Sequence, residues 1–490
     1  MNTSPVDRTI DSETGLSKRV VIIGGGITGL SAGWQLQKSA AQQGIPLQYT
    51  ILEQSDRWGG KIQTDQVQGF GDAPFIIDYG PDAFLTRKPW AYELARELGL
   101  SDAILPINVE NNKTFVLHDG KPVPLPEGLQ LLVPTQWKSF IQSPLFSPWG
   151  KLRAGFDLVI PRRQSDADET LASFVRRRLG AEVLDRVAEP MLGGVFNGDA
   201  EKQSMLATFP QFPMMEKQHG SLIRGSRLAA RERKAAPNAV SPFISFKTGT
   251  NELVKGLTSQ LTGEMRLSCA VSRIERLSGE RYRIRTSDGK AIDADALILA
   301  TPANVTARLL QEVSPEAAQQ LSGISYGGIG SAFFAFRRED VPHPLKGFGL
   351  VVPGSEKRKI DGVTWISSKW DHRAPSGHVL LRMFFGGPRT LASLQMDDNA
   401  IYSAVRAELR DIFGITTAPL FHRIYRWIEA YPQYNLGHLE RVASAESELP
   451  STIKIAGSAY KGVGVPDCVR QGREAATSVM NGLKTQLGVI

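Results

Sequence analysis

Apolar and polar positions follow two different periods near the start of the chain. Val20–Ile23 is an uninterrupted apolar run, which is typical of a strand covered on both faces of a parallel sheet. From Thr28 to about Gln43, apolar residues such as Leu30 and Trp34 recur at helical spacing and are predicted to face inward. Leu47–Leu52 is predicted to form the next strand. The pattern therefore predicts a strand, a helix and a second strand in direct succession.

Three glycines occupy the turn between the first strand and the helix. Gly24 permits a tight turn, Gly26 lacks the Cβ that would block a pyrophosphate, and Gly29 lets the helix lie close to the sheet. The helix N-terminus also presents free N–H groups and partial positive charge to phosphates. Glu53 ends the second strand, where a carboxylate can accept hydrogen bonds from ribose hydroxyls. This order predicts a dinucleotide site, and a purely structural glycine turn is the alternative.

The residues around Glu53 bear on which dinucleotide is bound. A carboxylate at this position repels the 2′-phosphate of NADP, which leaves FAD or NAD. Arg57 and Lys61 can neutralise phosphate, while Gly59 and Gly60 let the backbone pass close to a cofactor. This basic, glycine-rich tail favours FAD, and a solvated basic loop is the alternative interpretation.

A second motif of this kind lies near the carboxyl end, between Ile455 and Val469. A short strand runs into a glycine-rich loop, and a helix is predicted from about Cys468, with Asp467 as its N-cap. The N-terminus of that helix would stabilise the negative charge of a reduced flavin. Cys468 is predicted to be a small packing residue rather than a reactive thiol.

Composition excludes several other classes of protein. The 490 residues are 41% hydrophobic and 22% charged, as in a globular chain of several folding units. Only two cysteines occur, so a disulfide framework and a CxxC metal site are excluded, no metal is expected, and a reducing, cytoplasmic compartment is favoured. The net charge is only +7, and the basic residues are interleaved with acidic ones along the chain. This pattern predicts no nucleic-acid partner. No apolar run of about 18 residues is present, so no spanning helix is expected.

The predicted fold class is α/β with α+β inserts: a discontinuous Rossmann-type FAD-binding domain, a sheet-plus-helix substrate domain and a mostly helical insert. Residues 1–18 are expected to form a disordered tail. The FAD-binding domain would comprise 19–95, 247–305 and 441–490, the insert 96–210, and the substrate domain 211–246 and 306–440. The strands expected in the later parts of the chain are Arg266–Ile274, Ala294–Pro302, Ser331–Phe336, Gly349–Val352, Thr364–Ser368, Val379–Phe385 and Ile453–Ala456, with a helix over Ala400–Phe413.

The centre of the helical insert mixes apolar, aromatic and basic residues. They are Leu131, Leu132, Trp137, Phe140, Phe146 and Trp149, with Lys138, Lys151, Arg153, Arg162 and Arg163. This composition suits a contact with a membrane surface, on which the protein would be peripheral and cytoplasmic. Burial of the same apolar groups in helix packing suits it equally well, so both interpretations stay open.

These residues and motifs give the chain a family resemblance. It resembles the flavin amine-oxidase superfamily, and within it protoporphyrinogen oxidase and coproporphyrinogen III oxidase, over roughly residues 19–482. The resemblance includes EQSDRWGGK at 53–61, and its first and last motifs, GGGITGL at 24–30 and the C-terminal GVGVPDCVRQGREAA, are shared widely among FAD enzymes. GGVFNGDAEKQSM at 193–205 and WDHRAP at 370–375 are much more specific to this family.

The resemblance implies a non-covalent FAD held by residues from six stretches of the chain. Together with Arg57, which the charge argument suggests, the implied cofactor contacts are Gly24, Gly25, Gly26, Ile27, Thr28, Gly29, Glu53, Gln54, Lys61, Gly80, Pro81, Asp82, Ala83, Val271, Trp427, Gly464 and Val465. Val271 would reach the adenine through its backbone. Trp427 would lie near the flavin, and Gly464 with Val465 near the isoalloxazine.

The resemblance also implies substrate contacts. Trp370 matches an aromatic position that stacks on a pyrrole ring, and Val351 matches an apolar wall of the substrate slot. The eukaryotic-type enzymes carry an Arg, paired with a propionate, where this chain has Thr114. Lys113 could take over that contact, although a shift of one residue turns a side chain to the other face of a strand. This difference favours coproporphyrinogen III, which has four propionates.

The implied reaction is the six-electron oxidation of a porphyrinogen in haem biosynthesis, with dioxygen reduced to hydrogen peroxide. No side chain is identified as an acid or base, and the loop carrying Gly194 and Gly198 is placed near the pyrroles by position alone. Amine oxidation or carotenoid-type desaturation on the same fold is an alternative, and a non-enzymatic escort protein is another. The expected partners are a porphyrinogen and dioxygen, while handover to a ferrochelatase and a homodimer stay open.

Overall fold

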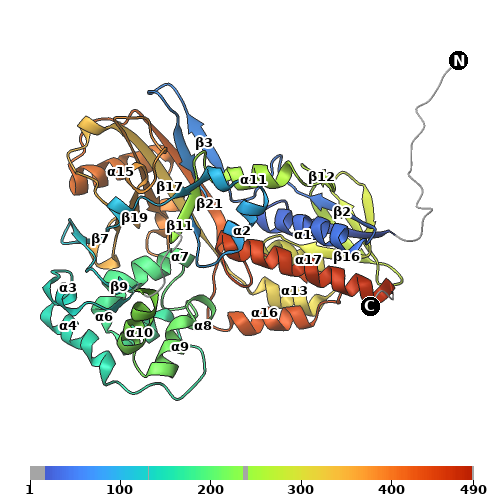
Figure 1. The fold of residues 1–490 in the computed structure, drawn as a ribbon, viewed down its shortest axis with the longest axis horizontal. Helices are drawn as coiled ribbons and strands as arrows, with labels where there is room; N and C mark the ends of the chain where they lie inside the picture. Colours follow the sequence, from blue (N-terminus) through green and yellow to red (C-terminus); the bar gives the residue numbers. More distant parts are fainter. Residues whose placement is uncertain (1–16, 131, 235–240, 488–490) are drawn as a thin grey trace.

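A computed structural model describes residues 17–130, 132–234 and 241–487 of the chain. Of the expected tail, residues 1–16 lie outside the described residues, as does Leu131. The chain folds into two adjoining parts, one built on a parallel sheet and the other on a larger mixed sheet with a group of helices below it (Figure 1). Among the described residues, no helix combines the length and the apolar character needed to cross a bilayer.

The first part contains a five-stranded parallel sheet in the order β12-β2-β1-β16-β22. The strands are β12 (Glu264–Arg266), β2 (Leu47–Leu52), β1 (Lys18–Ile23), β16 (Ala296–Leu299) and β22 (Ile453–Ile455). They come from three separate stretches of the chain, which confirms the Rossmann-like α/β architecture. The helices α1 (Ile27–Gln43), α2 (Trp90–Glu97), α11 (Asn251–Thr258) and α17 (Val465–Leu487) pack on one face. The other face is covered by α12 (Ala303–Leu310), α13 (Pro315–Ser322), α16 (His438–Ser447), β13 (Val271–Arg276), β14 (Tyr282–Thr286) and β15 (Ala291–Ala294).

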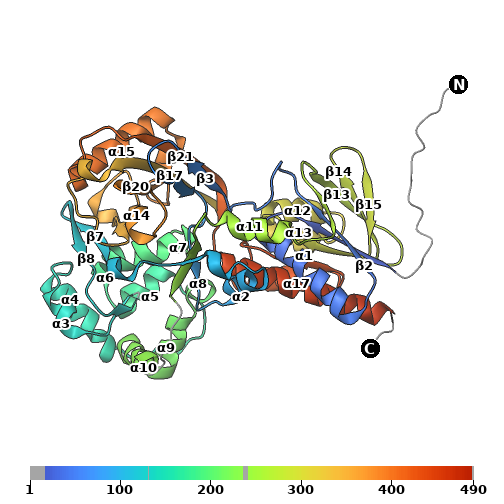
Figure 2. The ribbon, with the colours of Figure 1, turned by 45° about the horizontal axis from the view of Figure 1, so that its top comes forward.

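The second part contains a seven-stranded mixed sheet in the order β21-β17-β20-β19-β18-β7-β8. The strands are β21 (Phe421–Pro432), β17 (Tyr326–Arg337), β20 (His378–Phe385), β19 (Gly362–Trp365), β18 (Gly349–Val351), β7 (Thr114–His118) and β8 (Lys121–Pro124). Figure 2 shows α15 (Asp398–Phe413) against this sheet, where Leu381 and Leu409 are buried together. Because side chains alternate along a strand, Leu380, Arg382 and Phe384 lie on the opposite face, which we call the inner face.

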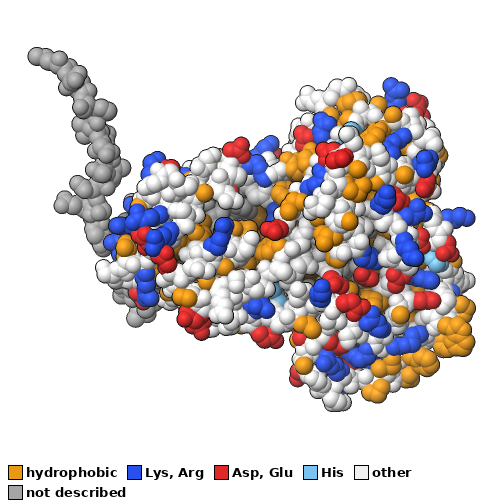
Figure 3. All heavy atoms as spheres, turned by 180° about the vertical axis from the view of Figure 1, so that it is seen from behind, with side chains coloured by type: hydrophobic (Ala, Val, Ile, Leu, Met, Phe, Trp, Pro, Cys, Tyr) orange, Lys and Arg blue, Asp and Glu red, His pale blue; other side chains and the backbone are white. Residues whose placement is uncertain are grey.

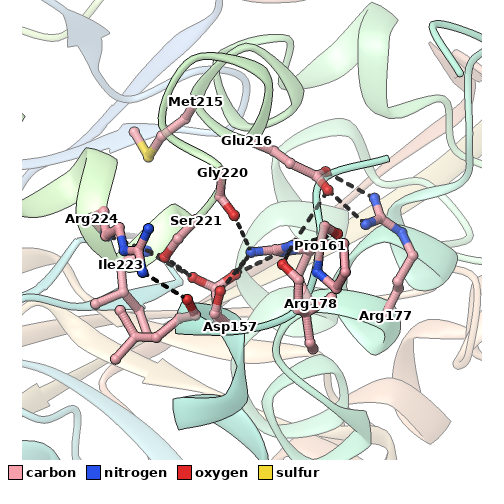
Figure 4. A network of polar contacts seen from close by, with 12 residues as sticks. Asp157, Pro161, Arg177, Arg178, Met215, Glu216, Gly220, Ser221, Ile223 and Arg224 are labelled. Atoms are coloured by element: carbon pink, nitrogen blue, oxygen red, sulfur yellow. Dashed lines mark hydrogen bonds and ion pairs between the residues drawn. The ribbon is translucent and has the colours of Figure 1, made fainter. Parts of the chain in front are cut away.

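The helices of the insert are tied together by a buried network of charges (Figure 4). These helices include α3 (Trp137–Gln142), α4 (Pro148–Gly155) and α5 (Leu171–Arg178). α9 (Gln211–His219) and α10 (Leu222–Lys234) pack with them, although their residues are in the stretch 211–246 that the sequence analysis assigned to the substrate domain. The fully buried Arg178 donates to the Asp157 carboxylate at 2.6 Å and to the carbonyl of Gly220 at 3.1 Å. Glu216 accepts from Arg177 at 2.8 Å. A buried charge is tolerated only when it is fully paired, so this network fixes α5, α9 and the turn after α4 as one unit.

Three local expectations are wrong. Residues 266–274 do not form one strand, because β12 ends at Arg266 and β13 begins at Val271 in a separate antiparallel sheet. Residues 364–368 are not all strand either, since α14 (Ile366–Lys369) follows β19. The C-terminal helix begins before Cys468, so Asp467 lies in its first turn and forms an ion pair with Lys88 instead of capping it. The insert is helical from α3 onward, whereas strands β6 (Ile104–Pro106) to β10 (Val133–Pro134) occupy its first third.

Candidate active site

The first glycine loop joins β1 to α1. Gly24 has a φ of +112°, and its N–H donates to the carbonyl of Leu52 at 2.8 Å. A Cβ on Gly29 would lie 1.9 Å from the Gly24 oxygen, so a side chain at this position would force the backbone apart. A Cβ on Gly26 would meet nothing nearer than the Gly60 Cα at 3.9 Å. The loop therefore keeps an open side at the N-terminus of α1, as a phosphate cradle requires.

Glu53 is held against this loop by hydrogen bonds to its carboxylate. One oxygen accepts from the Gly25 N–H at 2.7 Å, and the other accepts from the Ser55 N–H and hydroxyl at 2.9 and 2.8 Å. The backbone oxygen of Glu53 accepts from the Cys269 N–H at 2.8 Å, which brings Val271 near the same edge. The oxygen bonded to Gly25 keeps acceptor capacity for a ribose hydroxyl. The side chain of Gln54 is exposed.

The basic tail after Glu53 is folded against the protein rather than solvated. Arg57 donates to the carbonyl of Gly60 at 2.7 Å and so closes its own loop. The ammonium of Lys61 donates to the carbonyl of Ala430 on β21, and burial lowers the pKa of Lys61. A Cβ on Gly80 would lie 1.8 Å from the Lys61 carbonyl oxygen. Lys61 therefore lies where the two parts of the molecule meet.

The second glycine loop meets the first. α17 begins at Val465, directly after Gly464, and runs beside α1 (Figure 1). A Cβ on Gly472 would lie 2.3 Å from the carbonyl oxygen of Thr28, so the backbones of the two helices touch near their N-termini. Burial raises the pKa of the Cys468 thiol to about 11, which suits a packing role. Motifs from opposite ends of the chain thus share one edge of the parallel sheet.

Two side chains that the sequence did not single out hold the second loop. The hydroxyl of Tyr434 accepts from the Gly462 N–H at 2.8 Å and donates to the carbonyl of Ser458 at 2.9 Å. His438 stacks on Tyr434 with ring centroids 3.8 Å apart, and its Nε2 lies 2.9 Å from the carbonyl oxygen of Tyr460. Burial lowers the pKa of His438, so the neutral ring donates through Nε2–H.

Asp82 anchors a segment between the glycine loops and the second sheet. Its carboxylate accepts from Lys369 Nζ at 3.0 Å and from Trp370 Nε1 at 3.3 Å. Burial alone would raise the pKa of Asp82, but Lys369 and Arg382 outweigh it and hold the pKa well below its usual range. Asp82 therefore stays ionised, and its neighbours Pro81 and Ala83 are fixed with it.

Arg382 reaches the same segment from the inner face of the seven-stranded sheet. Its guanidinium donates to the carbonyls of Gly80 and Tyr79 at 3.1 and 3.3 Å, and it lies 4.5 Å from the ring centroid of Phe384. Trp427 donates to the same Tyr79 carbonyl at 2.8 Å. The Nε of Arg382 is buried and has no partner among the described residues. A buried donor without an acceptor is costly, so this atom is poised for a polar group of a ligand or water.

Cross-strand register places other predicted substrate residues on the inner face. Thr114, Gly349, Thr364 and Arg382 form one row across β7, β18, β19 and β20. The next row on this face is Val116, Val351, Gly362 and Phe384. Each row contains one glycine, Gly349 or Gly362, which has no side chain to cover the sheet at its position. Lys113 precedes β7 and is exposed.

Trp370 and Val351 are not brought into one cluster. Trp370 is fully buried and packs with Phe75, Phe333 and Leu380 at the end of the sheet nearest the glycine loops. Val351 is only half-buried and packs on the helical insert. The two therefore lie in different parts of the inner face, and Phe384 shares the row of Val351 while Arg382 lies in the adjacent row.

The loop that carries Gly194 and Gly198 connects the insert to the second sheet. Asn197 adopts a left-handed φ of 48°, and its side-chain nitrogen donates to the carbonyl of Gly328 on β17 at 2.7 Å. A Cβ on Gly198 would lie 2.7 Å from the side-chain oxygen of Gln203. The Gln203 amide is buried and, within the described ranges, has no partner for either atom. This loop thus places an unsatisfied amide beside the predicted substrate region.

Three potential metal ligands lie together elsewhere, two on the hairpin of β7 and β8 and one, Glu356, in the turn Gly354–Glu356 after β18. Ligand atoms of His118, Asp119 and Glu356 are within 4.8 Å of one another. The Glu356 carboxylate already accepts from the N–H groups of Asp119 and Gly120 at 2.8 and 3.0 Å. We interpret this group as a cap for the hairpin turn.

Sequence reasoning missed Arg382, Phe384, Gly472 and Tyr434 as site residues. Arg382 had a signal, because it is the one charged residue within the apolar run Val379–Phe385. A charge inside such a run requires a partner or a function. Gly472 lies within the C-terminal motif quoted above, but only the contact between helices shows its role. Tyr434 and Phe384 carried no comparable signal, because their roles depend on a turn and on strand register.

The fold and this site define a two-part flavoprotein oxidoreductase. A sequence profile of the family described as flavin containing amine oxidoreductase matches residues 27–480. The chain belongs to this family, whose members use a flavin, and falls in its porphyrinogen oxidase group.

Three relatives place the chain in that group. It is 33% identical to coproporphyrinogen III oxidase of Bacillus subtilis, over 94% of this chain and 98% of the relative. It is 31% identical to the chloroplastic protoporphyrinogen oxidase 1 of Arabidopsis thaliana, over 96% of this chain and 89% of the relative. The crystal structure of a candidate protoporphyrinogen oxidase from Exiguobacterium superposes with a TM-score of 0.83 at 31% identity, covering 95% of this chain and 99% of that one.

Proposed function

We propose that this protein uses a non-covalently bound FAD to oxidise coproporphyrinogen III to the porphyrin in haem biosynthesis. Each of the three two-electron steps breaks one meso C–H bond and one pyrrole N–H bond. A tautomerisation then moves one proton from the fourth meso carbon to a pyrrole nitrogen, so that the net loss is four meso hydrogens and two N–H hydrogens. One dioxygen per step takes up the two electrons and two protons as hydrogen peroxide. The flavin, when bound, supplies the acceptor for the hydride and passes the electrons to dioxygen. Protoporphyrinogen IX is the second candidate substrate.

The observation that carries the proposal is the position of the Asp78–Asp82 segment. Its carbonyls accept from Arg382 on the inner face, while Gly80 packs on the Lys61 carbonyl beside the first glycine loop. A tetrapyrrole on the inner face would therefore lie next to the flavin end of the cofactor. The other FAD contacts we propose are those predicted from the sequence, with the N-terminus of α1 at the pyrophosphate and Glu53 at the ribose.

The chain's own residues would orient the substrate rather than exchange its protons. Val351 and Phe384 offer apolar surface to pyrrole rings, and Thr114 and Arg382 offer polar groups on the adjacent row. The carbonyls of the Gly194–Gly198 loop and water would accept pyrrole protons. Coproporphyrin formed here needs an iron-inserting enzyme, so we include a ferrochelatase as a partner. Both cysteines are free and buried, which is compatible with the cytoplasm.

Anaerobic mixing with each porphyrinogen tests the reaction. Flavins in general absorb at about 450 nm when they are oxidised. We expect this absorbance to bleach with coproporphyrinogen III, and porphyrin fluorescence to appear after admission of dioxygen. Absorbance that stays oxidised under excess substrate would refute hydride transfer. Faster bleaching with protoporphyrinogen IX would overturn the choice of substrate but not the reaction.

Lys113→Ala tests the propionate contact. Lys113 is exposed beside Thr114 at the start of β7, where its ammonium would meet a propionate at the rim of the inner face. A solvated ion pair is worth up to about 1 kcal/mol, so we expect KM for coproporphyrinogen III to rise about fivefold, with kcat unchanged. Lys121→Ala, on the neighbouring strand, is the matched control. An unchanged KM would remove Lys113 from the site.

A further inference from the structure

A tyrosine near the end of β21 carries a hydroxyl group without a protein partner. Tyr431 pairs with Gly327 of β17 and is half-buried. Its backbone carbonyl accepts from the side chain of Gln433 at 3.1 Å, whereas its hydroxyl forms no hydrogen bond with the described part of the chain. A tyrosine hydroxyl that is withdrawn from bulk water normally has a partner. The free hydroxyl therefore points to a ligand.

A bulge in β21 sets the position of this tyrosine. Strands β17 and β21 pair in regular register as far as Ile329 and Trp427, and pairing resumes at Tyr431. Three residues of β21, 428–430, lie opposite one residue of β17, and Glu429 among them has a left-handed φ of 49°. Bulges turn side chains to new directions and are common beside active sites. The backbone thus gives Tyr431 a position that a regular strand would not give.

Tyr431 lies between the cofactor side and the predicted substrate loop. The carbonyl of the preceding residue, Ala430, accepts from the ammonium of Lys61, a predicted cofactor contact. The Gln433 side chain donates to the Tyr431 carbonyl and, at 3.2 Å, to the carbonyl of Asn197 in the predicted substrate loop. These contacts place Tyr431 where a bound substrate would adjoin the flavin.

The buried charges beside this position do not balance. Three cations face two carboxylates, and they are Lys369, Arg373 and Arg382 with Asp78 and Asp82. Lys369 lies 3.0 Å from the Asp82 carboxylate, and Arg373 lies 3.0 Å from the Asp78 carboxylate. Among the described residues, the hydrogen bonds of Arg382 go to backbone carbonyls and no ion pair includes it. Because a buried charge is costly without a counter-charge, we expect an anion beside Arg382.

Charge on the outer surface is distributed differently. On the face that Figure 3 shows, basic and acidic side chains are interspersed. Exposed ion pairs, such as Lys217 with Asp166 and Arg176 with Glu201, compensate one another in solvent. Solvated charges are screened by salt, whereas buried charges are screened much less. The excess charge at Arg382 therefore acts more strongly on an anion than a surface cation does.

Tyr431 can serve such an anion as a hydrogen-bond donor. Burial raises the pKa of Tyr431, while Arg382 opposes the rise and Asp82 adds to it, so the phenol keeps its proton at neutral pH. Arg382 supplies a second donor, because its buried Nε–H has no partner among the described residues. Two donors beside an excess positive charge suit a carboxylate, which accepts strong, charge-assisted hydrogen bonds.

We propose that Tyr431 and Arg382 form a site for one propionate carboxylate of coproporphyrinogen III. This assignment rests on the proposed function and adds a propionate contact to that of Lys113 at the rim of the inner face. Every pyrrole of coproporphyrinogen III carries a propionate, so one lies beside the flavin whichever meso carbon reacts. Protoporphyrinogen IX has propionates on only two of its four pyrroles and can place a vinyl group there. The site would therefore favour coproporphyrinogen III.

Titration with the product porphyrin tests the contact in the flavin-loaded protein without turnover. We expect Tyr431→Phe to weaken binding of coproporphyrin III about tenfold, as for the loss of a hydrogen bond to a charged group. Binding of coproporphyrin III tetramethyl ester, which has no carboxylate, should change less than about twofold. Tyr425→Phe provides the comparison, because Tyr425 lies on the same strand and its hydroxyl donates to Asp65 at 3.3 Å. It should leave both affinities unchanged.

Steady-state kinetics and thermal melting separate a substrate contact from a structural role. For Tyr431→Phe, KM for coproporphyrinogen III should rise about tenfold with kcat nearly unchanged, and KM for protoporphyrinogen IX should rise less. The melting temperature and the FAD content should stay as in the wild type, because the hydroxyl has no partner in the described part of the chain.

Several outcomes would overturn the carboxylate site. One is equal affinity of the wild type and Tyr431→Phe for coproporphyrin III. Another is an equal loss of affinity for the acid and the ester, since the hydroxyl would then contact a pyrrole. A lowered FAD content with unchanged porphyrin binding would assign the hydroxyl to the flavin, and a lowered melting temperature with unchanged porphyrin binding would assign it to the fold. A tenfold loss of coproporphyrin III affinity in a protein that oxidises no porphyrinogen would refute the proposed function and support the site.

Discussion

The five-stranded and the seven-stranded sheets position by different means the groups that we propose as cofactor and substrate contacts. At the edge of the parallel sheet the groups are mostly backbone: glycines in two loops, the N-termini of α1 and α17, and one carboxylate, Glu53. On the inner face of the mixed sheet they are side chains, such as Thr114 and Arg382, which lie in one row although the chain between them is long.

This difference has a physical consequence for substitution. A backbone-built site tolerates changes of side chain but not the addition of a Cβ where two backbones touch. A site built from side chains on a sheet depends instead on the identity of each side chain and on strand register. The two regions should therefore fail under different substitutions, and the expected effects can be ranked.

Gly29→Ala should have the largest effect. Its Cβ would lie 1.9 Å from the Gly24 oxygen, so β1 and α1 would have to separate and the phosphate cradle would distort. We expect purified protein without measurable FAD and a lower melting temperature. Gly482→Ala is the matched control, because its Cβ would meet no atom within 4 Å. Normal FAD content in the Gly29 variant would contradict a backbone-built site.

Arg382→Gln should have an intermediate effect, on both FAD binding and the stability of the protein. It removes two charge-assisted hydrogen bonds to the Asp78–Asp82 segment and leaves Asp82 with Lys369. We expect about 2 kcal/mol less stability and an FAD dissociation constant raised about tenfold. Differential scanning calorimetry and flavin fluorescence measure these quantities.

The control for this substitution comes from the same row of the sheet. Arg423 lies beyond Phe333 on β21, but its side chain is exposed; it donates to the carbonyl of His422 at 3.0 Å and lies 3.7 Å from the Asp65 carboxylate. Arg423→Gln should change stability by less than about 1 kcal/mol and leave FAD binding unaltered. Equal effects of the two changes would show that Arg382 does not link the cofactor side to the inner face.

The same comparison explains what sequence reasoning could and could not find. The first strand, helix and glycine loop were predictable because Val20–Ile23, Gly29 and Glu53 act within one short unit. The break between Arg266 and Val271 was not, because Ser268 takes a left-handed φ of 50° that no neighbouring residue signals. The pairing of β7 with β18 joins strands far apart in sequence, and only strand register places Thr114 opposite Gly349.

The second glycine loop is an exception to the contrast between a backbone-built site and a site built from side chains, because side chains hold it in place. Tyr434 and His438 hold a backbone-built loop, and neither belongs to a glycine motif. Burial keeps His438 neutral although Glu440 is near, and Arg441 adds to the lowering of its pKa. Because the folded state binds a proton at His438 less readily than the unfolded state does, the folded state becomes less stable in acid. This loop thus has a titratable support, His438.

The smallest expected effect is a pH dependence of FAD retention. Because the pKa of His438 in the folded state lies below its unfolded value of about 6.5, its contribution is complete above that value and is lost as pH falls below it. FAD should therefore dissociate faster at about pH 5.5 than at about pH 7.5, by less than tenfold. His438→Gln keeps a donor for the Tyr460 carbonyl but has no proton to gain, so it should flatten this profile.

Burial also lowers the pKa of His343, which packs on Trp365 and Phe413 on the far side of the mixed sheet. His343→Gln should leave the FAD profile steep, and a profile flattened by His343→Gln instead would show that the mixed sheet, not the second glycine loop, controls release in acid.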